Sequence, residues 1–347
     1  MRDDDEALRA LLEEAGPRAP LPAQDLEAIR EAARAEWRER YGGARVRSRV
    51  SGWWIAAAAA VVLAAAGLLL LRRAPAPPPA AGVASVERSR GEVLWSPGDG
   101  KLAPLSADGA GRTIPAGAVL ETVGSARAPG SVALRMAGGA SVRLDAGTRA
   151  RVASSTVIEL DRGAVYVDSG GPAARRESVA VRTAAGLFRS IGTQFEVRAE
   201  QGGSVTRLKV REGRVRLERG AESVLTDAGQ ELVVRGDGSL ERGEAAADAP
   251  EWDWVVTSAP MLDIEGAKVR TFLDWVARER GWRLEFADSE TAALADSVVL
   301  HGSIAHLTPA EAPDVVLPSG GLGYRVSNGK LVVFVAGGGK EPVRTPR

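Results

Sequence analysis

Two histidines, His301 and His306, are the side chains of this sequence best suited to bind a metal or carry a proton near neutral pH. They are five residues apart, so they do not share one face of a helix, and the chain has no cysteine to join them. A structural zinc site takes four ligands, most often histidine and cysteine. We therefore expect no metal site and no cofactor, and we expect both histidines to be ordinary interior or surface residues.

A glycine run near the C-terminus and the many carboxylates are the other candidates for chemistry. Gly337–Gly339 and Lys340 are similar to a phosphate-binding loop, but Phe334 stands where the first glycine is required and Glu341 replaces Ser or Thr. The carboxylates of the central segment alternate with arginines, as on a solvated face, so no pair suited to glycoside hydrolysis stands out. We expect residues 337–347 to be a tail, and we expect that the chain is not an enzyme.

An apolar stripe in the N-terminal segment could bind a protein partner. It repeats at three- and four-residue spacing and consists of Leu26, Ile29, Ala33 and Trp37. This spacing places the stripe on one face of a helix, which Asp25 can cap. Residues 1–49 are too few to bury the stripe in a core of their own. Either a partner covers it, or the segment is a partly disordered leader.

An uninterrupted apolar run, residues 53–71, follows this leader and contains no charged residue. At about 1.5 Å per residue, a helix of this length spans roughly 28 Å, close to the ~30 Å hydrocarbon core of a bilayer. Trp53 and Trp54 suit a membrane interface, and arginines are denser before the run than after it. We expect one transmembrane helix with a cytoplasmic N-terminus. A cleaved signal peptide is the alternative, but a charged leader this long exceeds its usual n-region.

A mainly β domain is predicted beyond a proline-rich linker at residues 74–85. Over residues 86–240 apolar residues alternate with polar ones such as Arg143, and glycines interrupt them every eight to twelve residues. Pairs such as Arg162-Gly163 and Glu212-Gly213 are expected to form turns, as are Gly138-Gly139 and Ala228-Gly229. The pattern favours either a β-solenoid or a β-sandwich.

A small α+β domain is predicted over residues 258–336, after a linker at 241–257. Strands are expected at 261–264, 284–286 and 298–300, a helix at 269–277 that ends at Gly281, and a hairpin that turns at Asn328-Gly329. Thr308–Glu311 forms the pattern of a capping box with Pro309 at the first helical position. Pro313 would disturb the hydrogen bonds of the helix that follows, so we expect that helix to be short or to begin later.

Composition narrows the choice of partners. The chain has 45 basic and 45 acidic residues, so nothing in its charge indicates a nucleic acid as a direct partner. Because cysteine is absent, no disulfide can stabilise the part expected outside the cytoplasm, and its folding rests on core packing.

Seven phrases of the β segment, taken together and in order, resemble one known family. They are GEVLW (91–95), IPAGAVLET (114–122), GGASVRLDAGTRARV (138–152), IELDRGAVYVD (158–168), VRTAAGLFRSIGTQFEVR (181–198), VREGRVRLERG (210–220) and LTDAGQELVV (225–234). They resemble the FecR family, the inner-membrane regulators of extracytoplasmic-function sigma factors. Residues 262–335 are similar to the short N-terminal domain of secretins and TonB-dependent receptors.

The resemblance implies a single-pass inner-membrane regulator with a periplasmic C-terminus. Its leader would bind an extracytoplasmic-function sigma factor, and its periplasmic part would receive a signal. In this family the signal commonly comes from the signalling domain of a TonB-dependent outer-membrane receptor. The leader lacks cysteine and histidine, which excludes a zinc-type anti-sigma fold. Some relatives cleave themselves at a Gly-Thr bond, which here is Gly192-Thr193. A glycine turn before a strand threonine is the favoured alternative, because activating the hydroxyl needs a base and strain.

Two other functions remain open from the sequence. A membrane-tethered periplasmic scaffold or envelope-binding module would use the same β domain without any sigma factor. A hydrolase of wall polymers comes third and would require a cleft with a carboxylate of perturbed pKa.

Overall fold

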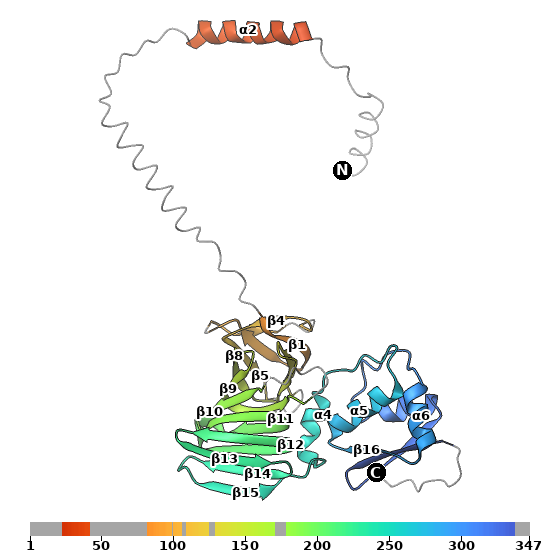
Figure 1. The fold of residues 1–347 in the computed structure, drawn as a ribbon. Coiled ribbons are helices and arrows are strands. Elements are labelled where there is room, and N and C mark those ends of the chain that lie inside the picture. The colour runs from red at the N-terminus through yellow and green to blue at the C-terminus, as the bar shows by residue number, and fades with distance from the viewer. Residues whose placement is uncertain are drawn as a thin grey trace. The chain divides into compact units, whose positions relative to one another are not determined.

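The structure is a computed structural model of the 347-residue chain. It describes residues 23–41, 82–98, 100–105, 109–124, 129–170 and 178–336, and Figure 1 shows their fold. The chain divides into two units, Met1–Pro75 and Ala76–Arg347. The second unit contains every strand of the described residues, so the contacts between the β domain and the C-terminal domain lie within one unit.

One helix of the leader is described, α2, Ala23–Tyr41. The helix predicted in the leader is therefore confirmed. It begins two residues before Asp25, so the expectation that Asp25 caps it is wrong, and Asp25 lies in the first turn.

The predicted membrane-spanning segment, residues 53–71, lies outside the described residues. Within the part of the chain that the structure does describe, no helix is both long and apolar enough to cross a bilayer. The first strand begins at Gly82, inside the linker expected at 74–85, and residues 74–81 of that linker also lie outside the described residues.

The β domain confirms the mainly β fold predicted for this segment. Its fifteen strands belong to one continuous hydrogen-bonded sheet, and one short 3-10 turn, η1 (Gln201–Gly203), connects two of them. The strands are β1 (Gly82–Arg90), β2 (Val93–Ser96), β3 (Ala103–Pro104), β4 (Thr113–Pro115), β5 (Ala118–Thr122), β6 (Ser131–Met136), β7 (Ser141–Leu144), β8 (Arg149–Ser154), β9 (Val157–Asp168), β10 (Ala180–Thr183), β11 (Gly186–Ala199), β12 (Val205–Arg219), β13 (Glu222–Asp227), β14 (Gln230–Arg235) and β15 (Leu240–Glu244).

Three long strands, β9, β11 and β12, connect two series of paired strands. The first half of β9 pairs with β8 and β10, whereas its second half pairs with β7 and β11. In the same way β12 pairs with β14 through its first half and with β13 through its second. Side chains from both series form one hydrophobic cluster, which includes Leu120, Val165, Phe195 and Leu217. The two series therefore share a single core.

The long strands bend at glycines for which the sequence predicts turns. Gly163 and Gly213 lie inside β9 and β12 with φ of 87° and 75°, so the turns expected there are wrong. A residue with positive φ can bend a strand without ending it, as in a β-bulge. The turns expected at Gly139 and Gly229 are confirmed, since these glycines connect β6 to β7 and β13 to β14.

The C-terminal domain contains a three-stranded sheet in the order β16-β18-β17, with helices packed on it. Its elements are η2 (Pro250–Trp252), α4 (Asp253–Thr257), α5 (Val269–Arg280), β16 (Arg283–Phe286), α6 (Ser289–Ser297), α7 (Ala312–Ser319), β17 (Leu322–Ser327) and β18 (Lys330–Val335). The core joins one face of α5 to the sheet through Phe272, Val276, Leu331 and Val333, all of which are buried. The predicted α+β class is thus confirmed.

Several elements expected in this domain are confirmed and two are not. Gly281 ends α5 in the left-handed conformation, and β17 turns into β18 at Asn328-Gly329, both as predicted. The strand expected at 261–264 is wrong, because this segment is irregular. The strand expected at 298–300 is also wrong, because it reduces to one bridge between Val299 and Lys268.

The second predicted helix begins late, as expected, but Pro309 lies in a turn before it, so the expectation that Pro309 takes the first helical position is wrong. One bond of the capping box forms, in which the Thr308 N–H donates to Glu311 Oε2 over 2.9 Å, but the Glu311 N–H donates to the Thr308 backbone oxygen and not to its hydroxyl. The helix itself, α7, starts at Ala312 and has Pro313 in its first turn. Proline is tolerated there because an N–H in the first turn has no partner within the helix.

Candidate functional site

The apolar stripe of the leader lies on α2. Ile29 is 59% exposed and Ala33 is exposed, so the described part of this face is open to solvent. Leu26 and Trp37 belong to the same helix, and their spacing from Ile29 and Ala33 places all four positions on one face. The structure thus places the four positions on a continuous helix, as the sequence predicts.

The Gly192-Thr193 bond lies inside β11 at an irregularity of its pairing with β12. Gly192 has a φ of 65°. The facing Gly213 packs closely on it, since a Cβ on Gly213 would lie 2.7 Å from the carbonyl oxygen of Gly192. Thr193 is buried, and among the described residues its hydroxyl has no hydrogen-bond partner. Its N–H donates to Ser169 Oγ over 3.1 Å. The bond is therefore in a bend of a strand rather than in a turn between strands.

A buried ion pair joins the β domain to the C-terminal domain. Arg143 projects from β7, and its guanidinium donates to both carboxylate oxygens of Glu279 in the last turn of α5, each over 2.7 Å. The side chains of the pair are only 1% and 7% exposed. Arg143 also donates to the carbonyl oxygen of Val255 over 2.8 Å. This arginine therefore holds two separate segments of the C-terminal region.

A second arginine, Arg211 of β12, holds the end of the same helix. Its Nη1 donates to the backbone oxygen of Glu279 over 2.9 Å, and its Nε donates to Ala247 O over 2.6 Å. A cation at this position is favourable because the last carbonyls of a helix carry partial negative charge. Gly281, which ends α5, approaches Arg211 closely, since a Cβ on this glycine would lie 2.5 Å from Arg211 Nε. Helix α5 therefore ends directly against the β domain.

A third arginine reaches in the opposite direction, from α5 to the β domain. Arg278 donates from Nε to Asp168 Oδ2 over 2.9 Å and from Nη1 to Glu212 over 3.0 Å. Gln194 also donates to Asp168, over 3.1 Å. Burial alone would raise the pKa of Asp168, but the hydrogen bonds and charge of Arg278 outweigh burial and hold that pKa below its usual value.

Aromatic side chains fill the space beside these charges. Tyr166 of β9 packs edge-on against Trp252, with ring centroids 6.0 Å apart, and against Trp254 at 6.5 Å. The indole N–H of Trp254 donates to Glu196 over 2.7 Å. Burial raises the pKa of Tyr166, so its phenol is neutral at physiological pH. Residues 250–255, expected to belong to a linker, are thus packed on the β domain.

These contacts form a structural junction, and they offer no arrangement of nucleophile and base. Within the described residues no group of three or more His, Asp or Glu side chains could hold a metal ion. His301 lies at the surface, where its Nδ1 is 2.8 Å from a carboxylate oxygen of Glu265.

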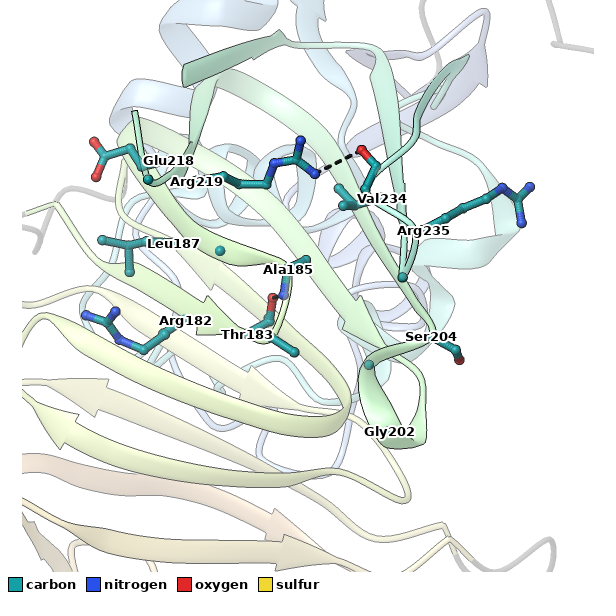
Figure 2. A pocket seen from close by; sticks show the side chains of 16 residues that line it. Arg182, Thr183, Ala185, Leu187, Gly202, Ser204, Glu218, Arg219, Val234 and Arg235 are labelled. Atoms are coloured by element: carbon teal, nitrogen blue, oxygen red, sulfur yellow. Dashed lines mark hydrogen bonds between the residues drawn. The ribbon is translucent and has the colours of Figure 1, made fainter. Parts of the chain in front are cut away.

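An open pocket of about 730 Å³ lies at the other end of the β domain, where four segments of the chain meet (Figure 2). Arg182, Arg219 and Arg235 stand at its rim. Two of them are paired, Arg219 with Glu222 at 2.7 Å and Arg235 with Glu241 at 2.9 Å. The third, Arg182, lies 4.0 Å from Glu159. Because a carboxylate lies beside each of the three arginines, this pocket lacks the free cations of an anion site.

The sequence gives no indication of the junction. Arg143 reads as one of the polar residues that alternate along a solvated strand, and this expectation is wrong, because the C-terminal domain covers it. Arg211 and Arg278 follow equally ordinary patterns. Gly281 is the one residue of the junction whose role the sequence indicates, because a glycine is typical of the end of a helix.

The fold defines a mainly β protein in which a β domain carries a small α+β domain. Residues 123–216, within the β domain, match the model of the family described as FecR protein, so this part of the chain is similar to that family. Comparison with the curated proteins gives no match.

Two crystal structures of a candidate anti-sigma factor from Parabacteroides distasonis are similar to the chain. The first has 16% identity and a TM-score of 0.33, and the match covers 61% of this chain and 96% of that one. The second has 16% identity and a TM-score of 0.31, with 58% and 93% covered. At these values the likeness carries no argument about function.

Proposed function

We propose that this protein regulates an extracytoplasmic-function sigma factor from the inner membrane. The observation that carries the proposal is the FecR match over residues 123–216. The apolar run at 53–71 and the arginines before it support a single membrane span with the leader in the cytoplasm. The two folded domains then lie in the periplasm. Within the β domain, two series of strands around one core favour a sandwich-like fold.

The leader helix α2 is the element that contacts the sigma factor in this proposal. Its stripe of Leu26, Ile29, Ala33 and Trp37 has the spacing by which an amphipathic helix docks into a groove. A periplasmic signal changes the stability or the protease access of the β domain and so releases the helix. The signalling domain of a TonB-dependent outer-membrane receptor is the proposed source of that signal.

Two alanines two residues apart give a matched test of the sigma-factor contact. Ala33→Glu places a charge in the stripe, whereas Ala35→Glu places the same charge on the opposite face of α2. The full chain and both variants are used to capture, one at a time, the extracytoplasmic-function sigma factors of the source genome. We expect one factor to bind the wild type and Ala35→Glu, and to bind Ala33→Glu at least about tenfold more weakly.

A membrane-tethered periplasmic scaffold is the alternative function, with the leader as a mere anchor sequence. It predicts that no sigma factor binds the wild-type chain. Equal binding by Ala33→Glu and Ala35→Glu would show that the stripe is not the contact. Reporter fusions at the two ends test the topology, and activity of both reporters in the same compartment would contradict it.

A further inference from the structure

A pocket of about 470 Å³ lies beside the buried ion pair, with walls from both domains. Ser141 and Arg143 of β7 form part of one wall. The segment around Leu262 and the exposed side of α5, with Asp274 and Trp275, form part of the other. Pockets of a few hundred Å³ at domain interfaces are a common form of small-molecule site. The chemistry of its lining determines what would bind there.

One wall of this pocket is apolar and partly open. Met261 is 46% exposed, so much of this large apolar side chain is in contact with water. Leu262 and Trp275 are half-buried and pack against the core of the C-terminal domain with their inner sides. An apolar group placed on Met261 and Trp275 would remove this surface from water, which is favourable.

The opposite wall contains two buried polar groups that lack partners. Ser141 is 5% exposed and Arg143 is 1% exposed. Among the described residues, neither Ser141 Oγ nor Arg143 Nε has a hydrogen-bond partner. Buried polar groups in native proteins are almost always hydrogen-bonded, and an unsatisfied one is destabilising. Both atoms are themselves buried, so a molecule in the pocket does not reach them, and this wall contributes its shape rather than a hydrogen bond.

The charges around the pocket leave one carboxylate uncompensated. Each of the lining arginines already holds a carboxylate, Arg135 that of Glu87, Arg143 that of Glu279 and Arg278 that of Asp168. Asp274 forms no ion pair within the described residues. Burial raises its pKa, Arg270 opposes this effect and Asp296 adds to it. A cation beside Asp274 would stabilise its charged form.

We propose that this pocket binds a small apolar molecule that carries one ammonium group, as the N-terminal residue of an apolar peptide does. Its ammonium group lies at Asp274, and its side chain covers Met261 and Trp275. Because the walls come from both domains, the bound molecule stabilises their contact. The site goes beyond the proposed function and does not depend on a sigma factor.

Binding is measured directly on the full chain in lipid nanodiscs, by titration calorimetry and by the intrinsic tryptophan fluorescence, to which Trp275 contributes. The probes are phenylalaninamide, N-acetylphenylalaninamide and the tripeptide Phe-Ala-Ala amide. We expect phenylalaninamide to bind at least about tenfold more tightly than its acetylated form, which lacks the ammonium charge. If the tripeptide binds more tightly than phenylalaninamide, the natural occupant is a peptide end; if more weakly, it is a free small amine. Both results support the site.

Two variants locate the binding, and a third is the control. Asp274→Asn should weaken phenylalaninamide about tenfold and remove the preference over the acetylated probe. Thr271→Trp, at an exposed position of the pocket lining, should abolish binding of every probe. Glu290→Gln on α6 removes an exposed charge outside the pocket and should change nothing. The proposal is overturned if the folded wild type binds no probe, if it binds both amides equally, or if Asp274→Asn matches the wild type.

Discussion

Arg143 of β7 and Glu279 of α5 form a bidentate ion pair, although they are 136 residues apart in the chain. The pair is almost fully removed from water, and its arginine also donates to Val255 O. It fixes the end of α5 on the β domain. The two domains therefore behave as one body wherever this pair is intact.

Glu279→Ala should strongly destabilise the protein. It leaves the Arg143 guanidinium buried without its counter-ion, and breaking a buried pair in this way costs roughly 3–5 kcal/mol. The free energy of unfolding in urea, followed by the intrinsic tryptophan fluorescence to which Trp252 and Trp254 contribute, measures the loss. The double variant Arg143→Met/Glu279→Leu should recover most of it, because it removes both charges together.

The exposed pair of Arg235 and Glu241 supplies the control for this prediction. Its two side chains are 47% and 57% exposed, so solvent screens their attraction. Glu241→Ala should leave the urea midpoint almost unchanged. A loss as large as that of Glu279→Ala would mean that burial does not set the strength of these pairs.

Asp168 should make the stability of the β domain sensitive to acid. Its pKa is lower in the folded chain than the unfolded value of about 3.9. Such a carboxyl stabilises the fold above its unfolded pKa, and this contribution is lost as the pH falls through the folded pKa. Stability should therefore decrease below about pH 4, and Asp168→Asn should show a smaller decrease over that window. Urea midpoints measured from about pH 6 to about pH 3 test this, and parallel curves for the two proteins would contradict it.

The strands of the β domain could be predicted because each buries one face. The alternation of residues such as Val165 and Val167 follows directly from packing on a single core. The bends could not, because a glycine with positive φ serves a turn and a bulge equally well. Gly163 and Gly213 take the second role, and only the pairing of the neighbouring strands decides it.

The junction between the domains could not be predicted for a different reason. Arg143 and Glu279 have the same local pattern whether they face water or each other. Their burial depends on a contact between segments more than a hundred residues apart, which no local periodicity encodes. Helix α6 was missed as well, although Asp288 caps it by accepting from the Thr291 N–H over 2.7 Å, a recognisable start signal.

Gly163→Ala should destabilise the β domain more than Gly229→Ala does. Both glycines have a φ near the same value, 87° and 82°, so both alanines incur the cost of the left-handed region, roughly 1–2 kcal/mol. Only at Gly163 would the new Cβ also lie 2.4 Å from Thr148 Cα, whereas nothing lies within 4 Å at Gly229. The additional clash should cost about 1–3 kcal/mol more. Thermal unfolding of the two variants measures the difference, and equal midpoints would show that the bend in β9 relaxes freely.

The Gly192-Thr193 bond should remain intact in the purified chain. Attack of the Thr193 hydroxyl on the Gly192 carbonyl requires a base to take the hydroxyl proton, and among the described residues no group hydrogen-bonds to that hydroxyl. The same hydroxyl is fully buried within β11, so water cannot take the proton readily. Intact mass spectrometry of the full chain over several days should give a single species, identical in behaviour to Thr193→Ala. Two fragments that divide the chain after Gly192, and that are absent from Thr193→Ala, would instead establish self-cleavage at this bend.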